Sequence, residues 1–205
     1  MADLASLLEP ATTAVVTMEM QRGVVGDLAF MPAIAEAVAE GDVIGKAAAV
    51  ARAARAAGAH VVHCTAEYRP ARAGASVNAP LLRSLARGEP HMIAGTPETE
   101  LVPDLGPEPS DLVSARAHGL TPFPGTDLDQ LLRNLGVRTL VVTGVSLNVG
   151  VLGLVIVAVD LGYEVVVVRD AVAGMPREYG DAVLANSIAA LATQARADEI
   201  VAMWS

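Results

Sequence analysis

The chain has 205 residues, of which 53% are hydrophobic and 18% are charged, and its formal charge at pH 7 is −9. This composition excludes a disordered chain, because disordered segments contain too few apolar residues to offset the entropy of ordering. The acidic balance argues against nucleic acid and anionic membrane surfaces as partners, since both attract basic proteins. We therefore expect a soluble, globular protein whose partner is a small molecule.

The length of the chain favours one domain, because a domain averages about 150 residues. We expect residues 1–205 to form a single α/β domain. No uncharged apolar run reaches the ~18 residues that a membrane span needs. The first residues, Met1-Ala2-Asp3-Leu4, lack the basic and apolar regions of a secretion signal, so a cytoplasmic location is expected.

Apolar segments alternate along the chain with segments of helical periodicity. Several of the apolar segments show no polar alternation, which is typical of parallel strands that are buried on both faces. The order of strands and helices predicts an α/β architecture with right-handed crossovers. The predicted strands are residues 13–19, 60–65, 111–115, 138–144, 163–170 and 199–203, and the predicted helices are residues 34–57 with an interruption near Gly41, 76–87, 126–135, 149–161 and 177–195.

Loops separate several of these elements. Residues 88–110 carry five prolines, which exclude a helix, so this segment is predicted to be a long ordered loop. Residues 23–32 form a second loop directly after the first strand. Together with residues 68–76, this second loop is expected to shape the pocket.

Nucleotide and metal motifs are incomplete in this chain. The first strand leads into Glu19-Met20-Gln21-Arg22-Gly23, whereas a dinucleotide site would have G-x-G-x-x-G there. Residues 41–47 resemble a P-loop but are one residue short and follow no strand, which favours a helix with an exposed lysine, Lys46. No two histidines have a metal-ligand spacing near an acidic ligand. We therefore expect neither a cofactor nor a metal.

His60, His63 and Cys64 share the second predicted strand. The two histidines are three residues apart, so they face opposite sides of the sheet, and we expect one to be buried and the other to lie at an edge. Cys64 is the only cysteine, which excludes an intrachain disulfide. It is expected to pack as a small hydrophobic residue, because no neighbouring motif activates it as a nucleophile.

Candidate site residues follow two of the predicted strands. In open α/β sheets the ligand binds beyond the carboxyl ends of the strands. Glu19 ends the first strand, and its carboxylate is costly to bury without a partner or a raised pKa. Arg116 and His118 follow the third strand, where Arg116 can bind an anionic substrate through two parallel hydrogen bonds. The plainer interpretation of all three is a rim or salt-bridged residue.

The fourth predicted strand ends in a turn, residues 144–150, that leads into a helix. Such a turn directs backbone N–H groups and the positive end of the helix dipole toward the cleft, which suits oxyanions and carboxylates. Ser146 also resembles the nucleophile of a G-x-S-x-G elbow, but the chain order His118, Ser146, Asp170 matches no standard hydrolase arrangement. The plainer interpretation is a glycine-bearing turn with Asn148 near the helix N-cap.

Three segments together resemble the isochorismatase-like hydrolase family. The first strand with the acid, Met and Gln of residues 19–21 is similar to one family segment, and Phe123-Pro124-Gly125-Thr126-Asp127-Leu128 with Leu132-Arg133 resembles its F-x-G-T-x-L…L-R segment. Residues 144–149, with Gly162-Tyr163, Val168 and Asp170-Ala171, resemble the segment that holds the nucleophile. The resemblance runs in order over residues 13–195. It implies a Rossmann-like, three-layer α/β/α fold with a six-stranded parallel sheet, and a homo-oligomer, either a dimer or larger.

The resemblance implies for most members an Asp–Lys–Cys triad that acts on amides or related bonds. This chain has Glu19 at the acid position, Arg116 or Ala117 at the lysine position and Gly150 at the cysteine position. Cysteine-based acyl transfer requires a thiolate, so a cysteine-independent reaction is favoured. The expected substrate is a small, carboxylated molecule. True isochorismatases are similar in having glycine at the cysteine position, and they hydrolyse a vinyl ether with the strand-end acid as proton donor, but they retain the lysine.

We therefore predict an isochorismatase-like hydrolase with Glu19 as general acid/base. The competing hypothesis is a catalytically inactive homologue that binds a small ligand or acts as an interaction protein. A perturbed pKa of Glu19 in a cleft would favour catalysis. Arg116 and His118 are the other predicted catalytic residues, and the predicted substrate-binding residues are Gln21, Phe123, Val145, Ser146, Asn148, Val149 and Gly150.

Overall fold

A parallel sheet of six strands runs through the centre of the molecule, in the order β3-β2-β1-β4-β5-β6. This computed structural model describes residues 3–205; Met1 and Ala2, which belong to the N-terminal segment considered above, lie outside the described residues. The predicted α/β fold with a six-stranded parallel sheet is confirmed. The strands are β1 (Thr13–Met18), β2 (His60–Ala66), β3 (Leu112–Arg116), β4 (Thr139–Val145), β5 (Glu164–Ala173) and β6 (Thr193–Ala195).

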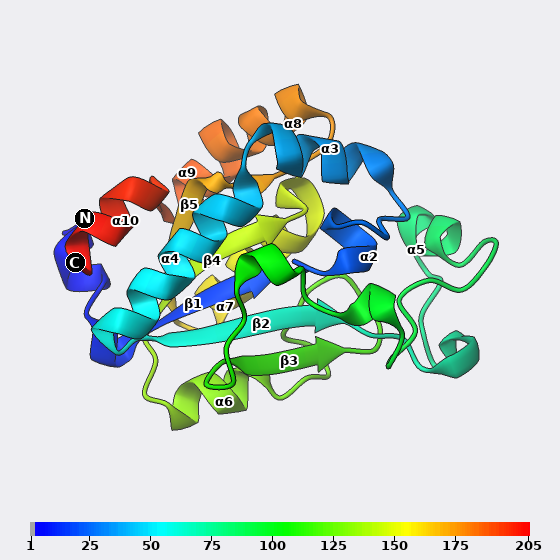
Figure 1. Cartoon of the computed structure of the whole chain (residues 1–205), viewed down its shortest axis with the longest axis horizontal. Coiled ribbons are helices and arrows are strands. Elements are labelled where there is room, and N and C mark those ends of the chain that lie inside the picture. Colours follow the sequence, from blue (N-terminus) through cyan, green and yellow to red (C-terminus); the bar gives the residue numbers. More distant parts are fainter. Residues whose placement is uncertain (1–2) are drawn as a thin grey trace.

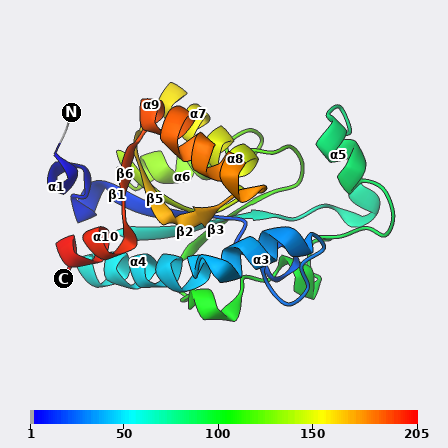
Figure 2. The ribbon, with the colours of Figure 1, turned by 90° about the horizontal axis from the view of Figure 1, so that it is seen from above.

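Helices cover both faces of the sheet, so the molecule has three layers (Figures 1 and 2). A hydrophobic core lies between the sheet and the helices on each face, and alternate strand residues point into one core or the other. Val15 packs in the core of one face, whereas Val16 packs in the core of the other. One face carries α3 (Pro32–Glu40), α4 (Val43–Ala57) and α10 (Ala197–Met203), and the other carries α6 (Leu128–Asn134), α7 (Leu152–Asp160), α8 (Arg177–Ala182) and α9 (Ala189–Leu191). The short helices α1 (Leu4–Leu7), α2 (Arg22–Val25) and α5 (Pro80–Leu85) lie in the connections.

The sixth strand is not the predicted one. Residues 199–203 were expected to form it, but they lie in α10, and β6 consists of residues that the periodicity assigned to the preceding helix. A short apolar run does not distinguish a strand from a buried helix segment. Here Asp198 and Glu199 in the first turn favour the helix, and the Arg196 N–H donates to the Glu199 carboxylate at 2.6 Å.

The remaining helix predictions hold with shorter bounds. The predicted break near Gly41 separates α3 from α4, and α5 is shorter than its predicted range. The last predicted helix is divided by a π-helical turn, Val183–Ile188, between α8 and α9. No helix within residues 3–205 combines the length and the apolar character needed to cross a membrane.

The carboxyl ends of the strands face the side of the molecule that carries α2 and α5 (Figure 1). Gln21, just after β1, is fully buried there and connects two other segments. Its amide nitrogen donates to the carbonyl oxygens of Ala66 and Thr99 at 3.1 and 2.9 Å, and its amide oxygen accepts from the Ala66 N–H at 2.8 Å. Gln21 thus fixes the end of β1 against the end of β2 and the proline-rich loop.

Replacing Gln21 by alanine should destabilise the fold. Three buried backbone groups would lose their partner, and each unsatisfied group costs about 1–3 kcal/mol. We expect Gln21→Ala to lower the free energy of unfolding, measured by urea denaturation, by at least about 2 kcal/mol. The control is Gln130→Ala on α6, an exposed glutamine whose side chain bonds only to Asn134. Equal effects of the two substitutions would contradict this role of Gln21.

A buried polar chain links β1, β2 and the segment before β3. Thr17 Oγ1 lies 2.7 Å from His63 Nδ1, and His63 Nε2 lies 3.1 Å from Asp111 Oδ2. Arg55 donates two hydrogen bonds to the Asp111 carboxylate, at 2.8 and 2.7 Å. As expected for opposite faces of a strand, His63 is buried and His60 is partly exposed. Burial lowers the pKa of His63, although Asp111 opposes the shift.

The stability of the protein should therefore decrease in mild acid. Because the pKa of His63 is lower in the folded chain than in the unfolded chain, the unfolded chain takes up protons first as the pH falls through about 6.5. Urea denaturation at pH 7, 6 and 5 should show a decreasing free energy of unfolding. In His63→Gln this part of the slope should disappear, whereas His60→Gln should keep it. A wild-type slope in His63→Gln would refute the assignment.

Candidate active site

A cavity of about 80 Å³ lies beyond the carboxyl ends of β1, β3 and β4. Most of its lining is apolar, and the charged side chains in it are Glu19, Arg72 and Arg116. Charges in such surroundings interact strongly, because little water screens them. Six of the ten predicted site residues line the cavity: Glu19, Arg116, Val145, Ser146, Val149 and Gly150.

Glu19 is positioned by an unusual backbone conformation. Its φ angle of 53° is in the left-handed region, which is uncommon for residues other than glycine and ends the extended course of β1. Its N–H donates to the carbonyl oxygen of Cys64 at 2.9 Å, which keeps it against β2. The side chain is 17% exposed and forms an ion pair with Arg116. Glu19 thus presents a carboxylate that is shielded but still reached by solvent.

Arg116, the last residue of β3, is more deeply buried, with 7% of its side chain exposed. Its Nη2 donates to the Glu19 carboxylate, and its Nε donates to the carbonyl oxygen of Gly119 at 3.4 Å. Its Nη1 is buried and has no hydrogen-bond partner. An unpaired buried donor is costly, so this nitrogen has the property expected of a ligand-binding group.

Arg72 is a second guanidinium at the cavity. It lies in the turn Pro70–Arg72, stacked 4.3 Å above the ring of Tyr68, and its Nη2 donates to the carbonyl oxygen of His91 at 3.3 Å. Its Nε is buried and has no partner. Among residues 3–205, three buried side-chain nitrogen or oxygen atoms have no hydrogen-bond partner, and two of them belong to these arginines. The other is Thr143 Oγ1 in β4.

The turn after β4 forms another wall of the cavity. It includes a π-helical turn, Leu147–Val151, in which the N–H groups of Val149 and Val151 donate to the carbonyl oxygen of Ser146 at 3.1 and 3.0 Å. Gly150 lies close to β1, because a Cβ atom built on it would be 3.1 Å from both Met18 Cε and the Val145 carbonyl oxygen. The turn contributes Ser146, Val149 and Gly150 to the lining, and none of these residues carries a thiol.

Two of the predicted substrate-binding residues do not line the cavity, and their side chains bond to backbone groups instead. Gln21 is occupied by the contacts with Ala66 and Thr99 described above. The Asn148 side chain donates to the carbonyl oxygen of Met175 at 3.2 Å and accepts from its N–H at 3.4 Å. Amide side chains that satisfy buried backbone groups have a structural role.

Phe123 and His118 also lie outside the lining. Phe123 is 6% exposed and stacks on Tyr163, with ring centroids 6.1 Å apart, within the core under α6 and α7. His118 lies against Gly125, where a Cβ atom would be 3.0 Å from its Nε2. Strand-end spacing placed these residues near the site, but the loop that holds them turns their side chains elsewhere.

The serine-elbow alternative receives no support from the contacts. Ser146 lines the cavity, but Asp170 pairs with Arg196 at 3.4 Å and accepts from the Ala197 N–H at 2.9 Å. Asp170 borders a different cavity, of about 230 Å³, so it does not orient a histidine toward Ser146. Within residues 3–205, no three His, Cys, Asp or Glu side chains gather closely enough to hold a metal ion.

Cys64 is buried in β2 and packs in the core, as predicted. Burial raises the pKa of its thiol to about 12. A thiol with such a pKa is almost wholly protonated at neutral pH and is a poor nucleophile. The cavity beside Glu19 is not lined by Cys64.

Sequence reasoning missed several residues that shape the cavity. Phe30 and Met31 come from the loop after β1, and Tyr68 and Arg72 from the loop after β2, so the prediction that these two loops shape the pocket is confirmed. None of the four belongs to a motif. The sequence did contain one signal for the two aromatic residues. Aromatic residues make up only 3% of the chain, yet each of the two loops contains one, Phe30 or Tyr68.

The comparisons with known proteins agree with this architecture. The sequence matches the model of the isochorismatase domain over residues 13–199. An isochorismatase family protein of Burkholderia thailandensis superposes with a TM-score of 0.77 and 29% identity, covering 95% of this chain and 96% of that chain. N-carbamoylsarcosine amidase of Thermoplasma acidophilum superposes with a TM-score of 0.72 and 26% identity, covering 91% of this chain and 97% of that chain.

A curated relative gives a shorter match. The uncharacterized isochorismatase family protein YwoC of Bacillus subtilis is 37% identical over 86 residues, which are 42% of this chain and 44% of YwoC. The matched part of the chain therefore spans less than half the length of that relative. The family match, in contrast, begins at the first residue of β1 and extends into α10. The chain belongs to the isochorismatase family.

Proposed function

We propose that this protein is a hydrolase of a small, carboxylated molecule and that it works without a cysteine nucleophile, with Glu19 as the acid/base group. One observation carries the proposal: Glu19 lies in a mostly apolar cavity at the strand ends, paired with Arg116, whose Nη1 has no partner. Hydrolysis by water requires a proton acceptor and, close to it, an unpaired hydrogen-bond donor that stabilises the negative charge on the reacting oxygen. The two arginines and one glutamate of the lining favour an anionic molecule.

The absence of an available thiol supports water as the nucleophile. The only cysteine of the chain is the buried Cys64, and Gly150 has no side chain. A covalent thioester intermediate therefore has no group to form on. The neighbour named as N-carbamoylsarcosine amidase supports a hydrolysable carbonyl compound, an amide or ester, as the substrate class.

The geometry supports a direct reaction sequence. The Glu19 carboxylate accepts a proton from a water molecule whose oxygen attacks the carbonyl carbon of the substrate. The carbonyl oxygen gains negative charge and accepts a hydrogen bond from Arg116 Nη1. The bond to the leaving amine or alcohol then breaks, and Glu19 returns the proton to that group. One water is consumed, the products are an acid and an amine or alcohol, and Glu19 ends as it began.

Arg116 has two tasks in this sequence. The ion pair fixes the position of the Glu19 carboxylate, and the second nitrogen binds the reacting oxygen. A planar guanidinium can do both at once, because its donors point in fixed and different directions. For the vinyl-ether alternative, Glu19 would instead donate a proton to the substrate.

Glu19→Gln tests the acid/base assignment. The substitution keeps the size of the side chain but removes the titrating group, so kcat/KM for small carboxylated amides and esters should fall by about 10²–10⁴-fold between pH 5 and 8. It also leaves the Arg116 guanidinium buried without its charged partner, so the free energy of unfolding should fall by about 1–3 kcal/mol. Urea denaturation shows whether the variant is folded under assay conditions.

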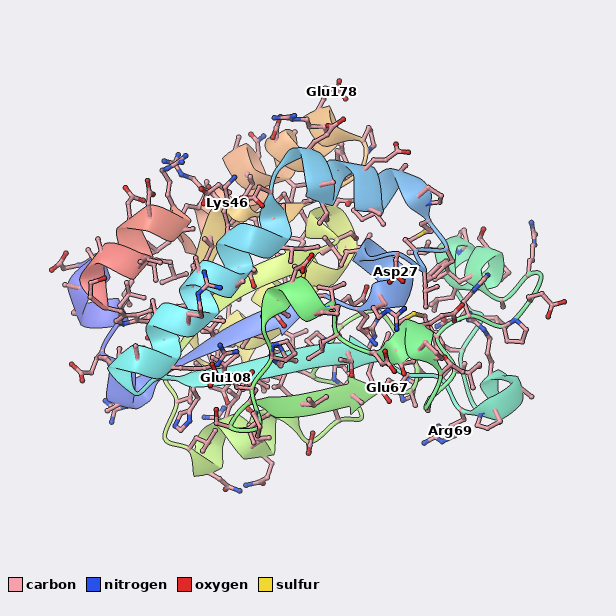
Figure 3. All side chains as sticks on the ribbon, in the orientation of Figure 1. Asp27, Lys46, Glu67, Arg69, Glu108 and Glu178 are labelled. Atoms are coloured by element: carbon pink, nitrogen blue, oxygen red, sulfur yellow. The ribbon has the colours of Figure 1, made fainter. Side chains whose placement is uncertain are left out.

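The matched control for Glu19→Gln is Glu67→Gln. Glu67 (Figure 3) follows β2 as Glu19 follows β1, but it accepts from Thr65 Oγ1 at 2.9 Å and does not line the cavity. Its substitution should leave kcat/KM within about threefold. Unchanged turnover in folded Glu19→Gln would refute the assignment. A wild-type protein that binds small acids but hydrolyses none of the amides, esters and enol ethers tested would be a small-ligand binder.

Cys64→Ala should leave turnover within about threefold, because the thiol does not line the cavity. The native protein should also resist iodoacetamide, whereas the urea-unfolded chain should react, since only the unfolded chain exposes the thiol. Mass spectrometry after alkylation measures both states. Loss of activity in a folded Cys64→Ala protein would return cysteine chemistry to consideration.

A further inference from the structure

Arg72 has no role in the reaction sequence above, yet it is a charged side chain with a buried, unpaired nitrogen at the same cavity. Glu98, on the adjoining loop, accepts from the Met92 N–H at 2.6 Å and contacts His91 Nδ1 at 3.2 Å. Its carboxylate interacts with the charge of Arg72 at longer range but forms no ion pair with it. The ring of Tyr68 supports the guanidinium from one side without neutralising it. Arg72 therefore retains a positive charge that a ligand can match.

The charges of the lining leave an excess of one positive charge. Glu19 and Arg116 neutralise each other in their ion pair, and Arg72 has no carboxylate partner within the described residues. Most of the other residues of the lining are apolar. A guanidinium in such surroundings is stabilised by a bound anion far more than by a neutral group. A monoanionic ligand would make the whole site neutral.

The position of Arg72 also indicates where the anion would lie. Tyr68, Arg72 and Gly119 line both the cavity beside Glu19 and an adjoining cavity of about 260 Å³. Arg72 therefore stands where the two spaces meet. A cavity of about 150 Å³ holds one benzene molecule, so the space of about 80 Å³ beside Glu19 suits a reacting group smaller than an aromatic ring.

We infer that the substrate is a short aliphatic monoanion whose carboxylate is bound by Arg72 while its hydrolysable bond lies beside Glu19. The inference rests on the proposed function, because the bound anion is a substrate only if the protein is a hydrolase. Arg116 is paired with Glu19, so Arg72 is the residue that selects the anion. Arg72 is thus a specificity-determining residue at the boundary of the two cavities.

Binding of two isosteric probes tests the inference without requiring turnover. Butyrate and butyramide differ in charge but hardly in size, and their dissociation constants can be measured by NMR titration. We expect the wild-type protein to bind butyrate at least tenfold more tightly than butyramide, and benzoate more weakly than butyrate. Arg72→Gln should abolish the preference for butyrate over butyramide. The matched control is Arg69→Gln, an exposed arginine of the same loop (Figure 3), which should keep it.

Arg72→Lys keeps the positive charge but loses the planar donor set, so it should weaken butyrate binding at least threefold and leave butyramide binding unchanged. If Arg72→Gln does not fold, Arg72→Lys tests whether Arg72 binds the carboxylate. Four results would overturn the inference: equal binding of the two probes by the wild type, benzoate binding as tightly as butyrate, a butyrate preference that survives in folded Arg72→Gln, or undiminished butyrate binding by folded Arg72→Lys.

Turnover separates the inference from the proposed function. If the protein hydrolyses esters, kcat/KM for monomethyl succinate should exceed that for dimethyl succinate at least tenfold, and Arg72→Gln should remove the difference. An Arg72-dependent preference for butyrate, with no hydrolysis of any amide or ester, would refute the proposed hydrolase but leave the anion site standing. Hydrolysis without any preference for the anionic ester would refute the anion site at Arg72 but leave the proposed hydrolase standing.

Discussion

The ion pair between Glu19 and Arg116 is the interaction on which the site depends. Met18 and Ser114 both pair with Cys64 in the parallel sheet, so the residues that follow them reach the same edge from either side of β2. Two charges can be buried there because each neutralises the other. The left-handed backbone of Glu19 ends β1 at this point. Without the ion pair, either side chain alone would be an uncompensated charge in an apolar cavity.

Most buried polar side chains are hydrogen-bonded in the sheet and its connections, here called the frame, whereas two at the cavity keep an unpaired nitrogen. In the frame, the side chain of Gln21 bonds to the backbone of two segments, and His63 is bonded on both ring nitrogens. At the cavity, Arg72 and Arg116 each keep a buried nitrogen without a partner. Elsewhere in residues 3–205 the only buried side-chain nitrogen or oxygen without a partner is Thr143 Oγ1. A frame with so few unsatisfied groups can hold the two arginine donors in place, and unpaired donors are what a ligand with acceptor oxygens needs.

The family fold and the chemistry of the site are separate matters. The solved relatives share the architecture, and the same scaffold supports several reactions when the residues at the strand ends change. In this chain the turn after β4 contributes uncharged residues to the cavity lining, while the charged groups come from β3 and from the segments after β1 and β2. In the proposed reaction the chemistry rests on Glu19 and Arg116, because the buried Cys64 thiol does not line the cavity.

The sequence by itself determined the parallel α/β fold, the acid after the first strand, Arg116 at the end of the third and the turn after the fourth, because burial on both faces and strand-end position are local patterns. It did not determine β6, whose three residues are too few to show a period. Only the tertiary structure turned Gln21, Phe123 and Asn148 away from the cavity and brought Arg72 to it. The direction of a side chain and the course of a loop depend on contacts with segments far along the chain, which local periodicity does not encode.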